Sequence, residues 1–425
     1  MKLNNKRTFF VGFAFLSISA FWQLYDNIIP LILTQTFNLG DAITGYVMAA
    51  DNILALFLLP FFGALSDKVN TKLGKRTPFI LSGTFLSVIM MFILAISNNS
   101  KNFTLFMVAL GIALIAMGIY RSPAVALMPD VTPKPLRSKA NAVINLMGSL
   151  GGVTSLVLIM VLVPKGDHPN YLPLFAIVAG IMVLAVFLLI MIVKENKIRN
   201  EMIALNQIDD VSKDEQVKTD NTLEPAVKRS LIFILFSVSL WFMGYNAVTS
   251  AYSRYAINVF NMEGGGFASP LLFANITAIL TFIPIGIISS KLGRKKVIMF
   301  GVALLATCFI SLAFFKSMNT LIYVPLGLVG IAWASINVNS YPMVVEMSKS
   351  GDIGKYTGIY YTFSMAAQTI TPIISGYLLQ YVGYWTLFPY AAICVFGALI
   401  TMSQVKHGDN KPTIEKGIEA FNTGD

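Results

Sequence analysis

Long apolar segments alternate with short polar ones from one end of the sequence to the other. An apolar run of about 20 residues, folded as an α-helix, is long enough to cross a hydrocarbon core roughly 30 Å thick. We predict one membrane-spanning helix in each of twelve runs: 9–33, 42–65, 77–97, 104–128, 139–163, 171–193, 229–253, 267–290, 297–316, 320–344, 354–379 and 384–404. The pattern therefore predicts an all-α membrane protein with twelve transmembrane helices.

The longest polar stretch divides these runs into six and six. Residues 194–228 mix Lys, Glu and Asp with few aromatic side chains, which is typical of a linker. We therefore predict two pseudo-symmetric six-helix bundles, at 1–193 and 229–405. A cytoplasmic linker at 194–228 joins them, and a cytoplasmic tail follows at 406–425.

The distribution of charge predicts how the chain crosses the membrane. Only 12% of the residues are charged and 56% are hydrophobic, yet the net charge is +10. The basic residues gather in the termini, the linker and the even-numbered connections, so the positive-inside rule predicts that both termini are cytoplasmic. We expect a multi-pass protein of the cytoplasmic (plasma) membrane. Topology and anionic lipid headgroups explain the basic charge, so no nucleic-acid partner is expected.

Several functional classes lack support in the sequence. The first apolar run is too long for a cleavable signal and contains Trp22 and Asp26, so it is expected to remain as the first helix. Cys308 and Cys394 fall inside predicted helices, and no Walker loop, metal cluster or nucleophile elbow can be read. We therefore expect no cofactor, no metal site and no enzymatic activity.

A cluster of glycine and basic residues follows the second helix of each predicted half, as an internal repeat would. Glycine permits a tight turn there, and the basic side chains can pair with acidic helix ends. A plain cytoplasmic loop is one interpretation, but the repetition favours a gating loop. Its predicted residues are Gly63, Asp67, Gly74, Lys75 and Arg76 in the first copy, and Gly293 and Arg294 in the second.

These features resemble the major facilitator superfamily. Ser66-Asp67, six further residues and the segment 74–80 (Gly-Lys-Arg-Thr-Pro-Phe-Ile) are similar to the S-D-x6-G-x-R-x-P-F-I motif of plant sucrose transporters and their relatives. The segment 122–130 resembles the fourth helix of the same family. A more distant likeness is to the glycoside-pentoside-hexuronide cation symporters. The resemblance implies a sugar transporter that is driven by a cation gradient and works by alternating access.

Two departures from these families affect the prediction. Sucrose transporters carry Arg in the fourth helix where this chain has Val125, while Arg121 lies one turn earlier and on the same face. The two second-helix Asp residues of melibiose-type sodium carriers are Ala55 and Leu59 here. Protons are therefore predicted as the coupling ion in preference to sodium.

Ionisable residues inside a bilayer cost at least roughly 2.5–3.5 kcal/mol each, so each needs a partner or a function. For Asp130 the resemblance implies the proton-coupling carboxylate, and the alternative is a helix-end partner of the basic loops. Asp26 and Asp51 are predicted at similar depth, as a proton relay or outer gate, or as a structural pair whose members repel if both are ionised. Arg121 is predicted to bind sugar hydroxyls or to pair with an Asp, and Arg254 lies at the far end of the seventh helix.

A sugar site needs amide groups for the hydroxyls and aromatic platforms for the ring faces. The alternatives for such residues are an interfacial aromatic belt and interhelical hydrogen bonds. The predicted substrate-binding residues are Trp22, Tyr25, Arg121, Asn145, Trp241, Tyr245, Asn246, Trp333, Asn337, Tyr341 and Gln368.

The sequence as a whole predicts a monomeric secondary active transporter embedded in the lipid bilayer. Its expected activity is proton-coupled symport of a sugar or glycoside, such as a disaccharide. The alternative is a proton-coupled exporter of drugs or other small molecules, which shares the architecture but is expected to have a more apolar cavity.

Overall fold

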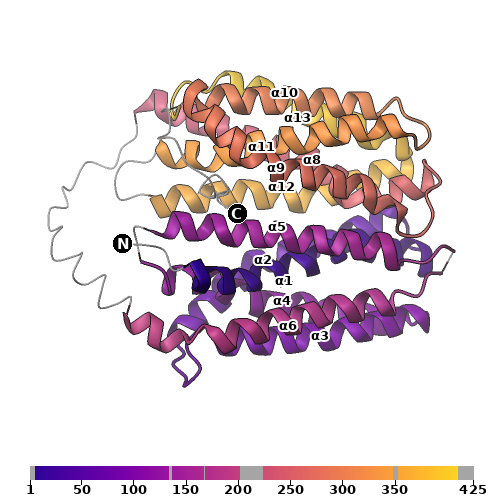
Figure 1. The fold of residues 1–425 in the computed structure, drawn as a ribbon. Helices are drawn as coiled ribbons and strands as arrows, with labels where there is room; N and C mark the ends of the chain where they lie inside the picture. Colours follow the sequence, from indigo (N-terminus) through magenta and orange to yellow (C-terminus); the bar gives the residue numbers. More distant parts are fainter. Residues whose placement is uncertain (1–4, 134–135, 167, 202–223, 348–352, 410–425) are drawn as a thin grey trace. The chain divides into compact units, whose positions relative to one another are not determined.

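The computed structural model describes residues 5–133, 136–166, 168–201, 224–347 and 353–409 (Figure 1). Parts of the predicted linker and tail, at 202–223 and 410–425, lie outside these ranges. Everything below refers to the described residues.

Twelve long helices occupy the twelve predicted runs. The first six are α1 Asn5–Leu31, α2 Asp41–Lys68, α3 Thr77–Asn99, α4 Phe103–Asp130, α5 Arg137–Leu162 and α6 Leu172–Ile192. The other six are α8 Pro225–Asn258, α9 Ala268–Leu292, α10 Arg294–Leu312, α11 Tyr323–Glu346, α12 Ile353–Tyr381 and α13 Leu387–Ser403. The all-α fold class predicted from the apolar runs is confirmed.

Eleven of these helices are long and apolar enough to cross a membrane. The twelfth, α12, is long enough at 29 residues, but its tyrosines, threonines and glutamines make it less apolar than the others. The protein is therefore an integral membrane protein.

Local sequence explains where several helices begin and end. The Asn102 side chain caps α4 by accepting a hydrogen bond from the Leu105 amide. α8 is longer than its predicted run of 229–253, because Pro225 is favourable in a first helical turn and the segment that holds Arg254 and Tyr255 is buried. After α1 the chain widens into a short π-helix, η1 Ile32–Thr36, which the apolar pattern did not predict.

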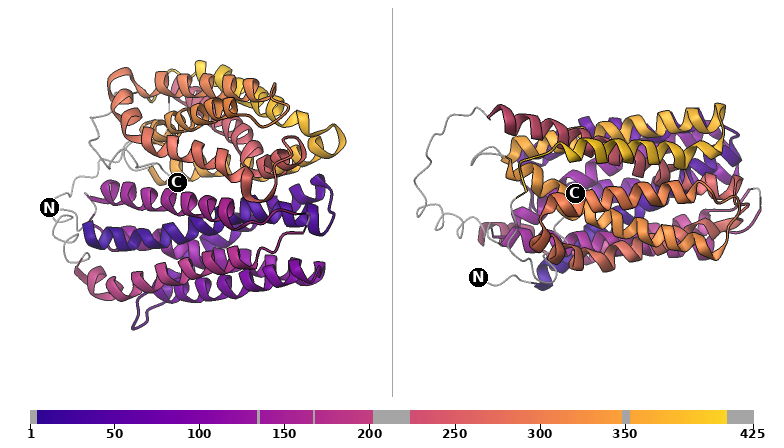
Figure 2. Two further views of the ribbon diagram at one scale, coloured as in Figure 1. Left: turned by 45° about the vertical axis from the view of Figure 1, so that its right-hand side comes forward. Right: turned by 90° about the horizontal axis from the view of Figure 1, so that it is seen from above.

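The chain forms two compact units. Unit 1 contains Met1–Gln23, Ile53–Leu158 and Asn170–Asp220, and unit 2 contains Leu24–Asn52, Ile159–Pro169 and Asn221–Asp425. Within unit 1, α3 packs against α4 and α6 (Figure 1). Within unit 2, α11 packs against α9 and α10, and α13 packs against α8 and α10 (Figure 2).

Small residues allow the closest helix crossings. A Cβ atom on Gly83 of α3 would lie 2.8 Å from the Ala116 carbonyl oxygen of α4, and one on Gly330 of α11 would lie 2.2 Å from the Ala274 carbonyl oxygen of α9. In a bilayer, where lipid tails are as apolar as leucine, this close backbone packing is a main source of helix association.

Candidate functional site

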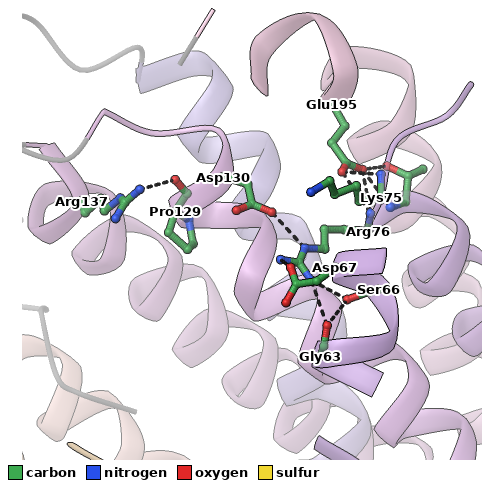
Figure 3. Close-up of polar contacts among 10 residues, drawn as sticks. Gly63, Ser66, Asp67, Lys75, Arg76, Pro129, Asp130, Arg137 and Glu195 are labelled. Atoms are coloured by element: carbon green, nitrogen blue, oxygen red, sulfur yellow. Dashed lines mark hydrogen bonds and ion pairs between the residues drawn. The ribbon is translucent and has the colours of Figure 1, made fainter. Parts of the chain in front are cut away.

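Arg76 joins the end of α2 to the end of α4 in unit 1 (Figure 3). Its Nη2 atom lies 2.5 Å from Asp67 Oδ1, and its Nε atom donates to Asp130 Oδ2 at 2.9 Å. Its Nη1 atom donates to the Gly63 carbonyl oxygen and to the Ser66 hydroxyl. Only a planar guanidinium offers donors in so many fixed directions, so Arg76 acts as the hub of this site.

Glu195 caps the N-terminus of α3 from the segment that follows α6. Its carboxylate accepts the backbone N–H groups of Lys75 at 2.7 Å and Thr77 at 2.9 Å, the Arg76 N–H at 3.0 Å, and the Thr77 hydroxyl at 2.8 Å. A carboxylate is favourable at this position because the first amides of a helix are unpaired and carry partial positive charge. The sequence placed Glu195 in the linker and gave no sign of this role.

Gly74 is required by this cap. Its φ angle is +127°, and a Cβ atom there would lie 2.1 Å from a Glu195 carboxylate oxygen. The predicted glycine of the first loop is thus needed both for its backbone conformation and for the close approach of Glu195.

The second loop repeats this arrangement in unit 2. Arg294, at the start of α10, pairs with the Glu346 carboxylate at the end of α11. Asp409, which follows α13, accepts the backbone N–H of Lys295 at 2.9 Å, next to Gly293 with its φ of +95°. In both halves the loop arginine pairs with an acid at the end of the fourth long helix. In both, a carboxylate beyond the sixth long helix accepts loop amides.

The carboxylates of Asp26 and Asp51 interact electrostatically inside unit 2. Asn52 Nδ2 donates to Asp51 Oδ1 at 2.8 Å. Asp26 makes no hydrogen bond or ion pair with the described residues. The structure therefore brings together the two acids that the sequence predicted at similar depth.

Arg121 lies on an exposed part of α4. Val125, one turn further along, is also exposed, in agreement with the shared face expected from their spacing. Arg121 has no hydrogen-bond or ion-pair partner among the residues that the structure describes.

The predicted aromatic residues of unit 2 differ in their accessibility. The rings of Tyr245 and Trp333 stack with centroids 3.6 Å apart and 3° between their planes, and both side chains are partly exposed. Phe242 packs edge-on against Trp333 at 5.5 Å. Trp241 is 0% exposed. In this conformation Tyr245 and Trp333 offer an aromatic surface, whereas Trp241 is enclosed in the core.

Three predicted side-chain amides of unit 2 make no hydrogen bond to the residues that the structure describes. The Nδ2 atom of Asn246 is buried and has no hydrogen-bond partner there. Asn337 is 6% exposed and Gln368 is half-buried, and neither amide bonds to a described residue. Buried polar atoms are usually hydrogen-bonded, so the open Nδ2 atom of Asn246 points to a ligand or water.

The register of α8 and α12 places Gln368 at the height of the aromatic pair. The Ser239 hydroxyl on α8 donates to the Phe363 carbonyl oxygen on α12 at 3.2 Å. The chain reverses its direction from each long helix to the next, and α9, α10 and α11 come between α8 and α12 in the sequence. The two helices α8 and α12 therefore run in the same direction. Gln368 is five residues beyond Phe363, and Gly244 is five residues beyond Ser239, so Gln368 lies level with Gly244 and Tyr245.

The remaining predicted lining residues are engaged within the chain. The Trp22 ring packs edge-on against Phe21 at 5.4 Å, and Tyr25 is buried. Asn145 is half-buried on α5, and the Tyr341 hydroxyl lies 3.0 Å from Thr357 Oγ1 between α11 and α12.

An ion pair that the sequence did not predict lies at the start of α2. Arg254, on α8, is 1% exposed, and its Nη1 atom lies 2.5 Å from Asp41 Oδ1. The Tyr384 hydroxyl donates to the other carboxylate oxygen of Asp41 at 2.8 Å. Arg254 lies at the far end of the seventh predicted helix, whereas Asp41 lies just before the predicted run 42–65, so the sequence pattern does not connect them.

The chain matches the family model described as Major Facilitator Superfamily over residues 11–340, with a second match over 272–420. It is 27% identical to a sucrose transport protein of Arabidopsis thaliana over 31% of this chain and 25% of that protein. It is 22% identical to an isoprimeverose transporter of Lactiplantibacillus pentosus, over 67% of this chain and 59% of that protein. It is 24% identical to a glucuronide carrier protein homolog of Escherichia coli, over 83% of this chain and 78% of that protein. The chain thus spans only a quarter of the plant relative.

Solved structures share the fold over nearly the whole chain. A bacterial homologue of the human drug peptide transporters PepT1 and PepT2 superimposes with a TM-score of 0.67 and 14% identity, covering 95% of this chain and 99% of that one. The nucleoside transporter NupG gives the same score and identity over 95% of this chain and 100% of that one. At such low identity these likenesses establish the fold alone.

Proposed function

The chain belongs to the Major Facilitator Superfamily, and from that premise we propose that it carries a sugar or glycoside across the membrane together with a proton. The family and its relatives make the chain a transporter and not an enzyme. The names of three relatives refer to sucrose, isoprimeverose and a glucuronide, which supports a substrate with one or more sugar rings.

The observation that carries this proposal is the set of open amides beside the stacked pair Tyr245 and Trp333. An amide can donate two hydrogen bonds and accept two, which matches the alternating donors and acceptors of sugar hydroxyls. The buried Nδ2 atom of Asn246 has no partner among the described residues, which costs about 1–3 kcal/mol, and a bound hydroxyl would remove that cost. An exporter of apolar drugs would gain nothing from Asn246, Asn337 and Gln368 in this state, so these amides favour the sugar over the drug.

We propose that proton coupling is carried by carboxylates whose charged partners can change during the cycle. Arg76 pairs with both Asp67 and Asp130. A proton on Asp130 would therefore weaken the contact between Arg76 and α4 and leave the other contacts of Arg76 in place. Asp26 and Asp51 form a second candidate, because a proton bound by either relieves their mutual repulsion. In the proposed topology both termini are cytoplasmic, and the loops of Arg76 and Arg294 gate the cytoplasmic side.

Uptake into vesicles reconstituted with the protein tests the function directly. With labelled sucrose, isoprimeverose and a glucuronide as probes, we expect an inward proton gradient to drive accumulation of at least one of them. A protonophore should abolish that accumulation, and an inward sodium gradient should not replace the proton gradient. Accumulation that requires sodium would refute proton coupling. Exclusion of all three sugars with extrusion of a cationic dye would establish the exporter.

Two alanine variants on α11 test the predicted lining. Asn337→Ala is expected to weaken binding of the transported sugar roughly three- to tenfold, the equivalent of one hydrogen bond, at nearly unchanged stability. Asn339→Ala is the matched control on the same helix, because the Asn339 amide is bonded to the Ser335 carbonyl oxygen at 2.9 Å. It should leave binding unchanged.

Trp241→Ala should behave differently from Asn337→Ala. Since Trp241 is fully enclosed, its removal leaves a cavity and should cost about 3–5 kcal/mol of unfolding free energy. Calorimetric titration and thermal unfolding of each variant separate the two effects. Unchanged sugar affinity in Asn337→Ala would remove this residue from the site.

A further inference from the structure

A polar cavity of about 350 Å³ lies in unit 2, next to the ion pair of Asp41 and Arg254. Its volume falls within the range of small-molecule sites, about 300–1,000 Å³. The polar residues that line it are Thr34, Gln35, Asp41, Asn258, Gln380 and Tyr384. None of them belongs to the predicted lining formed by Tyr245, Trp333 and the open amides.

One wall of this cavity is built from unusual backbone. Thr34 and Gln35 lie in the π-helix η1, where the Phe37 N–H donates to the Ile32 carbonyl oxygen at 3.2 Å. Asn38, two residues after the end of η1, has a φ of +53°, which is uncommon for a residue other than glycine. A π-type turn is a common way for an α-helix to end, and here it carries Thr34 and Gln35 into the wall of the cavity.

The side chains of the cavity leave hydrogen-bonding groups open. Gln35 makes no hydrogen bond to the described part of the chain. Gln380 uses Oε1 to accept the Ala42 N–H at 2.9 Å, which leaves its NH₂ group as a donor. Asn258 uses Nδ2 to donate to the Arg254 carbonyl oxygen at 2.9 Å, which leaves its Oδ1 as an acceptor. The cavity thus offers neutral donors and acceptors at several points of its wall.

The charge in the wall is already balanced. Asp41 is the only acid among the lining residues, and its two oxygens are occupied by Arg254 and Tyr384. A cation would have to compete with a buried guanidinium for this carboxylate. The cavity therefore suits a neutral ligand with several hydroxyl groups better than a metal ion or an amine.

We infer that this cavity is a second sugar-binding site, separate from the lining formed by Tyr245, Trp333 and the open amides. The choice of a sugar as its ligand rests on the proposed function. Asp41 starts α2, and Lys68 at the other end of α2 precedes the loop of Arg76, so the proposed topology puts the cavity on the outer side. There it would receive substrate before transport. Because Asp41 belongs to its wall, the bound sugar would touch the ion pair with Arg254.

Binding stoichiometry tests this inference on the purified full chain. Equilibrium dialysis with labelled sucrose, isoprimeverose and a glucuronide should give two bound molecules per chain for the preferred sugar. Gln35→Ala is expected to weaken one of the two sites roughly three- to tenfold, as the loss of one hydrogen bond predicts, and to leave the other unchanged. Asn258→Ala should weaken the same site. Trp333→Ala should weaken only the site formed by Tyr245, Trp333 and the open amides.

Gln404→Ala is the matched control, because Gln404 is exposed and lies outside the cavity. It should bind as the wild type does. One bound molecule in the wild type, with unchanged affinity in Gln35→Ala and Asn258→Ala, would overturn the inference and leave the proposed function standing. If none of the three sugars binds at either site, the proposed function fails as well.

Discussion

Neutralising Asp41 alone, by Asp41→Asn, is expected to destabilise the protein more than removing both charges of its ion pair. Arg254 is 1% exposed, and its Nε atom has no hydrogen-bond partner among the described residues. Without the Asp41 charge the buried guanidinium is left uncompensated. Breaking a buried pair on one side typically costs about 3–5 kcal/mol. The double variant Asp41→Asn/Arg254→Gln has no isolated charge and should recover much of that loss.

Thermal unfolding of the two single variants and the double variant measures this coupling. We expect an interaction free energy of at least about 2 kcal/mol between Asp41 and Arg254, because both side chains are largely buried. The pair of Lys165 and Glu263 in the same unit is the control. Its atoms are 3.1 Å apart, but the side chains are 77% and 66% exposed. An exposed pair should couple by no more than about 1 kcal/mol. Equal coupling in both pairs would show that burial of Arg254 has no consequence.

The helices could be predicted from the sequence because the signal for each is local. A run of about 20 apolar residues is enough to span the hydrocarbon core, whatever else the chain does. The two helical segments that the sequence did not predict also have local causes. The extension of α8 to Asn258 carries the polar residues Arg254 and Asn258, so the apolar pattern did not predict it. The π-helix η1 lies across the end of the predicted run 9–33, and composition does not distinguish a π-turn from an α-turn.

The partners of the charged residues could not be predicted in the same way. Glu195 lies more than one hundred residues from the amides that it caps, and a run of mixed charges around it is typical of a linker. Likewise, Trp241 and Trp333 both lie in mid-helix, and helical spacing alone does not say which faces a neighbouring helix. Packing decides that Trp241 is enclosed and that Trp333 stacks on Tyr245.

Asp130→Asn is expected to uncouple transport from the proton gradient. A carboxylate that carries the coupling proton must change its charge during the cycle, and its affinity for protons must differ between the two end states. Asn cannot titrate, but its Oδ1 atom can still accept the hydrogen bond that Arg76 Nε donates to Asp130 at 2.9 Å. Accumulation of sugar against its gradient should therefore be lost. Exchange of labelled for unlabelled sugar, which needs no net proton movement, should largely survive.

Glu346→Gln is the matched control for Asp130→Asn, because Glu346 holds the equivalent place at the end of α11 and pairs with Arg294. Only the Asp130 variant should separate accumulation from exchange if the first half alone carries the proton. Measurement of both activities in the same reconstituted vesicles distinguishes a proton-coupling role of Asp130 from a structural one. In a structural role, accumulation and exchange would fall together. Continued accumulation by Asp130→Asn would refute the assignment. The coupling role would then pass to Asp26 or Asp51, and Asp130 would be a structural partner of Arg76.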